Sequence, residues 1–98
     1  MATFITTLHF TEQGIKAVWD TCDRAAAFKA AAEKLGVKVA GQYWTLGAFD
    51  GVLVLEAPNE ETATAALLHL GSLGNIRTQT ARAYGPAEMQ KVLALLRQ

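Results

Sequence analysis

Three side chains of types that carry acid–base and anion-binding chemistry are spread along the chain. His9 ends a β-branched and aromatic run, Asp50 precedes a glycine, and Arg77 follows a glycine-rich turn. An imidazole beside a carboxylate can act as a general base, and a guanidinium can hold an anionic substrate or an enolate. The three residues predict a proton-transfer site if the fold brings them together. They fit equally a solvated strand-end histidine, an Asx-turn aspartate and a surface arginine.

Seven expected elements must position these side chains. Runs of β-branched and aromatic residues predict strands at residues 3–10, 37–46, 52–55 and 76–84. Helical periodicity and capping residues predict helices over 24–35, over 60–73 and from Pro86 onward. This order is the ferredoxin-like βαββαβ arrangement of an α+β protein, followed by a C-terminal helix.

The ferredoxin-like sheet has the strand order 4-1-3-2, with both long helices on one face. The end of the first strand then lies beside the starts of the third and fourth strands. His9, Asp50 and Arg77 are therefore expected at one end of the sheet. The more apolar alternate face of the first strand excludes His9, which would leave its ring on the open side.

An even-length loop between the second and third strands sorts their side chains onto two faces. One face is uniformly apolar and is expected under the helices; it carries Trp44, Leu46, Leu53 and Leu55. The other face is mixed but still carries valines and a tyrosine; its members are Tyr43, Thr45, Val52, Val54 and Glu56. An exposed face of that kind normally marks an interface. We expect two chains to pack these open faces together, as a homodimer or a larger oligomer.

Composition limits the class of protein further. The chain has 98 residues, 51% of them apolar, which fits one domain over residues 1–98. Nine basic and nine acidic side chains cancel, and no apolar run spans a bilayer, so neither nucleic acid nor a membrane is an expected partner. Cys22 is the only cysteine and the two histidines are separated, so no metal or cofactor is expected. The first basic residue is Lys16, which predicts no signal peptide and a cytoplasmic location.

Three segments carry a resemblance to a known family. They read YWTLGAFDGVLVLEAP at residues 43–58, GSLGNIRT at 71–78 and FTEQGI at 10–15. Together they resemble the GYD-domain family of small bacterial proteins. The name-giving Gly-Tyr-Asp is altered here, because Phe49 stands where a tyrosine is usual. The resemblance implies a dimeric α+β barrel and implies little about activity, since fold alone does not set function.

Three function classes stay open. The first is a homo-oligomeric protein that binds a small apolar or aromatic molecule in a barrel shared between subunits, with Tyr43 and Glu56 as candidate ligand-binding residues. The second is a cofactor-free barrel enzyme, monooxygenase- or isomerase-like, with His9 as general base and Asp50 and Arg77 as its partners. The third is an assembly module without a ligand.

Overall fold

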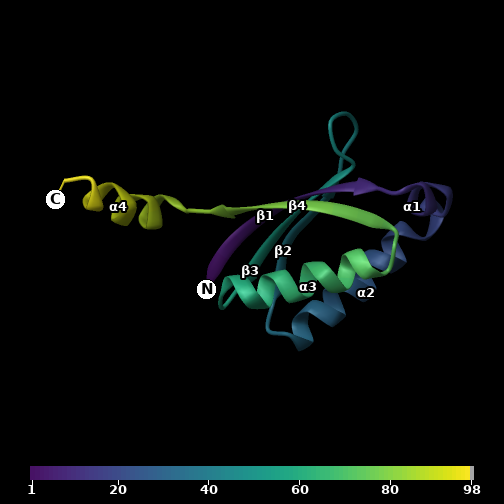
Figure 1. Ribbon diagram of the computed structural model, residues 1–98, viewed down its shortest axis with the longest axis horizontal. Helices are drawn as coiled ribbons and strands as arrows, with labels where there is room; N and C mark the ends of the chain where they lie inside the picture. Colours follow the sequence, from purple (N-terminus) through teal and green to yellow (C-terminus); the bar gives the residue numbers. More distant parts are fainter. Residues whose placement is uncertain (98) are drawn as a thin grey trace.

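A computed structural model describes residues 1–97 as a helix layer packed on one face of a sheet (Figure 1). The strands are β1 (Ala2–Phe10), β2 (Lys38–Trp44), β3 (Gly51–Ala57) and β4 (Ile76–Ala83). The helices are α1 (Glu12–Lys16), the 3-10 turn η1 (Val18–Asp20), α2 (Thr21–Lys34), α3 (Glu60–Ser72) and α4 (Pro86–Leu95).

The sheet confirms the predicted topology. Its strands lie in the order β2-β3-β1-β4, and every neighbouring pair is antiparallel. Helices α2 and α3 cover the same face (Figure 1). The chain therefore has the ferredoxin-like α+β fold, with α4 added at its C-terminal side.

Alternating side chains of the central strands build the core. Phe4 and Leu8 of β1 and Leu53 and Leu55 of β3 are all buried beneath the helices. Thr6, between Phe4 and Leu8 on the same face, is fully buried, and its hydroxyl lies 2.8 Å from that of Thr80. That hydrogen bond satisfies the Thr6 hydroxyl, which would otherwise be costly to bury.

The helices present small and apolar residues to this core. The buried members are Phe28 and Ala32 of α2 and Ala63, Ala66 and Leu70 of α3. Asn59 caps α3 as its sequence position indicates, because its side chain accepts a hydrogen bond from the Thr62 amide at 2.8 Å. Gly36, after α2, has a φ of 83°, which glycine adopts without strain.

One sequence-based expectation was wrong. Leu46 does not join Trp44, Leu53 and Leu55 beneath the helices, because β2 ends at Trp44 and leaves Leu46 fully exposed in the loop. The loop before β3 spans residues 45–50, an even number of residues as expected, and the Thr45 amide donates to the Asp50 carbonyl across it. Strand alternation stops where the ladder stops, and the sequence does not mark that point.

A dense set of hydrogen bonds joins the end of β1 to the start of β4. The Thr11 amide donates to the Asn75 carbonyl at 3.0 Å, and the Thr11 hydroxyl donates to the Gly74 carbonyl at 2.6 Å. Gln13 adds hydrogen bonds to the Leu73 carbonyl and to the Asn75 side chain. A side-chain carbon at Gly14 would lie only 2.0 Å from the Asn75 carbonyl oxygen. Glycine at this position is therefore required by the close approach of two backbones.

Helix α4 lies away from the rest of the fold (Figure 1). Arg82, near the end of β4, holds its first turn through a 3.0 Å ion pair with Glu88. The same guanidinium lies over the Tyr84 ring at 4.5 Å. Met89 and Leu95 of α4 stay exposed, and so does Leu96 directly after it.

Replacing Gly14 by alanine should destabilise the fold. The added methyl group has to push apart α1 and the turn into β4, and overpacking of this kind costs about 1–3 kcal/mol or more. Urea unfolding of Gly14→Ala beside Gly71→Ala measures the difference, because Gly71 is helical and has open space around it. Equal loss of stability in the two variants would contradict this account of the junction.

Glu88 provides a pH-dependent contact at the base of α4. Its hydrogen bond from Arg82, helped by one from the Gly85 amide, lowers the pKa of the carboxyl below its ordinary value. The contact is complete at neutral pH, where Glu88 is ionised, and is lost as pH falls through the lowered pKa. In a carbon-detected NMR titration, Glu88 should protonate at lower pH in the native chain than in Arg82→Met. Identical midpoints would show that the ion pair does not form.

Candidate functional site

The three predicted catalytic residues lie at the same end of the sheet. His9 and Asp50, however, are not hydrogen-bonded to each other. His9 and Arg77 are direct cross-strand neighbours on the open face. The His9 Nε2 lies 2.9 Å from the Ala48 carbonyl oxygen, so it donates to that carbonyl. The Asp50 carboxylate instead accepts the Phe10 amide at 2.8 Å. Asp50 thus ties the β2–β3 loop to β1, and the catalytic role of the three residues stays a prediction.

The two predicted ligand-binding residues also lie on the open face. Tyr43 is exposed and pairs with Val52 across the β2–β3 ladder. Glu56 is half-buried between Lys38 and Thr3 on its neighbouring strands. Their part in binding a ligand stays a prediction too, and neither side chain lines the pocket described next.

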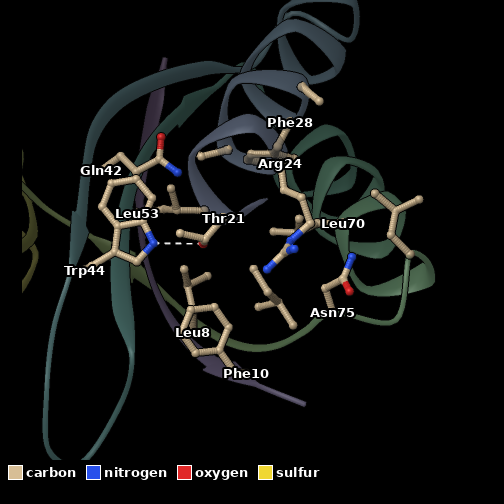
Figure 2. A pocket seen from close by; sticks show the side chains of 14 residues that line it. Leu8, Phe10, Thr21, Arg24, Phe28, Gln42, Trp44, Leu53, Leu70 and Asn75 are labelled. Atoms are coloured by element: carbon tan, nitrogen blue, oxygen red, sulfur yellow. Dashed lines mark hydrogen bonds between the residues drawn. The ribbon is translucent and has the colours of Figure 1, made fainter. Parts of the chain in front are cut away.

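A pocket of about 260 Å³ lies on the other side of the sheet, between its helix-covered face and the helices (Figure 2). It opens at the end of the fold where β1 and β2 finish and β4 begins. The sheet contributes Leu8, Phe10, Gln42, Trp44, Leu53 and Ile76. The helices and the turn before β4 contribute Thr21, Arg24, Ala25, Ala27, Phe28, Leu70, Leu73 and Asn75. The walls are mostly apolar, with a few polar groups among them, which is typical of a small-molecule site.

Among residues 1–97, Arg24 is the only charged residue that lines this pocket. It comes from the first turns of α2, and its guanidinium lies among the lining side chains (Figure 2). Nη1 donates to the Ala17 carbonyl at 2.7 Å and Nη2 to the Gly14 carbonyl at 3.3 Å. These two bonds fix the plane of the guanidinium from the α1 side.

The Nε of Arg24 is shielded from solvent and has no hydrogen-bond partner among residues 1–97. Leaving such a donor unsatisfied costs about 1–3 kcal/mol. Buried polar groups of folded proteins are almost always paired, so this atom points to a missing acceptor. The pocket therefore has a mostly apolar lining that includes one cationic side chain, Arg24, whose Nε is unpaired among residues 1–97.

Aromatic side chains form two walls of the pocket. Trp44 closes the β2 side, and its Nε1 donates to the Thr21 hydroxyl at 3.0 Å (Figure 2). This bond crosses from the sheet to α2 and fixes the orientation of the indole. Phe10 and Phe28 face the same space from β1 and α2. A flat ring can stack against surfaces of this kind.

The helical spacing of α2 contained a signal for Arg24. Arg24 precedes Phe28 by four residues and lies one position before Ala25, so it falls on the buried stripe of α2. A charged residue on an apolar stripe is uncommon and indicates a function or a buried partner. Trp44 could be predicted as an aromatic anchor, but its bond to Thr21 depends on the tertiary fold.

Other classes of site find no support in the part of the chain that the structure describes. Over residues 1–97, no three potential metal ligands cluster together. None of the helices described there is long and apolar enough to cross a bilayer.

Comparison with known proteins places the chain among relatives of similar length. It is 34% identical, over 90 residues, to the glutamine synthetase and cystathionine beta-lyase binding protein of Thermus thermophilus. The match covers 91% of this chain and 95% of that protein. The name of this relative states that it binds two enzymes.

Solved structures share the fold. The crystal structure of TTHA0845 from Thermus thermophilus matches with a TM-score of 0.56 and 22% identity, over 87% of this chain and 95% of that one. The crystal structure of MtbAldR matches with a TM-score of 0.58 and 11% identity, over 86% of this chain and 52% of that one. At these identities the likeness concerns the fold alone.

The family comparison agrees with the segments singled out in the sequence. The model of the GYD domain matches residues 4–93. That range holds all three motif segments, and their hydrogen bonds meet at the end of the sheet beside the pocket. The chain therefore belongs to the GYD domain family.

Proposed function

We propose that this protein is a homo-oligomeric binding protein that takes a small, largely apolar molecule into the pocket between the sheet and helices α2 and α3. The pocket itself carries the proposal, because it joins apolar walls to a few polar groups in about 260 Å³. The site lies within one chain, on the face opposite to the open sheet face. That position differs from the shared interior predicted from the sequence.

The volume limits the size of the molecule. Each water occupies about 30 Å³ in the liquid, so the pocket has the space of about nine waters. One aromatic ring with a short substituent fits this space, and a drug-sized molecule does not. Small residues of α2 such as Ala25 keep the space open on the helix side.

Self-association is the second half of the proposal. The open face of the sheet carries Ile5, Val52 and Val54 beside Tyr43, and α4 carries exposed leucines. Two copies would bury these surfaces together, which leaves the pockets on the outer faces of the sheets. A small domain gains substantial stability from such an interface.

A partner protein is a second candidate for the same exposed surfaces. The relative from Thermus thermophilus, 34% identical to this chain, is named for binding two enzymes. Helix α4 extends from the body (Figure 1), and several of its apolar side chains are exposed. Docking of another protein there is compatible with a ligand in the pocket, so the two roles do not exclude each other.

Filling the pocket should abolish binding of a neutral ring. The chain has two tryptophans, and Trp19→Phe removes the one outside the pocket, which leaves Trp44 as the fluorescent reporter in the pocket wall. Toluene should then change the Trp44 emission saturably, and Ala25→Phe should remove the change. Ala26→Phe is the matched control, because Ala26 is exposed on the same helix. If toluene changes the Trp44 emission of Ala25→Phe as it does that of the parent protein, toluene binds outside this pocket.

Sedimentation tests the assembly. The native chain should sediment with at least twice the mass of one chain at micromolar concentration. Val54→Lys should shift it toward the monomer, since a buried charge without a partner is costly. Ala30→Lys, on the exposed side of α2, should leave the mass unchanged. A native chain that is monomeric would contradict the proposed self-association. The open face would then be available to a different protein.

A further inference from the structure

The chemistry of Arg24 narrows the class of ligand. Its guanidinium is always charged and is held in place by the Gly14 and Ala17 carbonyls, while Nε is shielded from solvent and unpartnered. No carboxylate of residues 1–97 lies within salt-bridge distance of this group. Within residues 1–97, the groups that accept hydrogen bonds from this guanidinium are therefore backbone carbonyls and no carboxylate.

The surroundings of Nε favour one kind of acceptor. A ligand that fills the pocket displaces water from beside the guanidinium, and the apolar walls then strengthen an ion pair formed there. A phosphate or sulfate needs several donors to replace its hydration, and among residues 1–97 Arg24 is the only cationic side chain in the lining. A carboxylate spreads a single negative charge over two oxygens and matches the planar guanidinium. The amide of Gln42, at the edge of the pocket beside Trp44, offers a second polar contact (Figure 2).

We propose that the pocket binds a small carboxylate with an apolar, ring-sized body, and that the Arg24 guanidinium pairs with the carboxylate. This inference rests on the proposed function and adds its ligand class. The apolar body lies between Trp44 and Phe28, and the charged end points toward α1. Arg24 is a binding residue here and takes part in no covalent step.

Matched probes test the charge preference directly. Phenylacetate and phenylacetamide have nearly the same shape, and only the first is charged at pH 7. In calorimetry with the full chain, phenylacetate should bind at least about tenfold more tightly than phenylacetamide. A hydrogen bond to a charged partner contributes a free energy that corresponds to about this ratio. 2-Phenylethylamine, a cation, should bind more weakly than the amide. Toluene completes the panel as the neutral ring.

Variants assign the preference to Arg24. Arg24→Met should abolish the difference between acid and amide. Lys29→Met is the matched control, because Lys29 is exposed on the same helix and outside the pocket lining, and it should keep the tenfold difference. Since Arg24→Met also removes two hydrogen bonds to the α1 region, it could fail to fold. The Arg24 Nε–H resonance of the native chain is then the readout, and phenylacetate should shift it where phenylacetamide does not.

The outcomes separate this inference from the proposed function. If toluene binds and phenylacetate is no tighter than phenylacetamide, the carboxylate inference is wrong and the apolar pocket stands. If none of the four probes binds, both proposals are wrong. If phenylacetate is preferred equally in Arg24→Met and the native chain, another group holds the charge and the assignment to Arg24 fails.

Discussion

The close contact between the backbones of Gly14 and Asn75 determines how the site is built. It brings α1 against the turn into β4, and Thr11 secures both sides with its amide and hydroxyl. Because α1 is fixed there, the Gly14 carbonyl sits in a defined place, and so does the Ala17 carbonyl that follows the helix. Those two oxygens hold the guanidinium of Arg24. The contact between α1 and the turn into β4 thus determines how the Arg24 guanidinium is oriented in the pocket.

The pocket exists because α2 is built from small residues on the side that faces the sheet. Alanines keep the helix regular and fill little space, so the gap beneath them is left open beside the large ring of Phe28. Trp44 would otherwise rotate freely at the end of β2, and its bond to Thr21 makes it a wall. Partial burial of Arg24 beside these groups is costly for stability, and a bound anion would offset that cost.

Much of the fold could be predicted from the sequence because its signals are local. Strand alternation, the Asn59 cap and the glycine after α2 act within a few residues, so the element order and the sheet topology follow. The end of β2 could not be predicted, since Leu46 continues the apolar alternation although the ladder has already ended. A strand ends where its partner's hydrogen bonds end, and that is a property of two segments together.

The candidate site was harder to predict for a related reason. His9, Asp50 and Arg77 attract attention by type, and strand order brings them to one end of the sheet. Yet which atom each side chain bonds depends on loop conformation, and Asp50 bonds the Phe10 amide. Arg24 carries no motif, and helical periodicity assigns charged residues to solvent by default. Its importance comes from an unpaired Nε, which becomes visible only once all of its neighbours are in place. In this fold Arg24 is informative because its Nε lacks a hydrogen-bond acceptor among residues 1–97. A ligand beside the guanidinium would supply an acceptor.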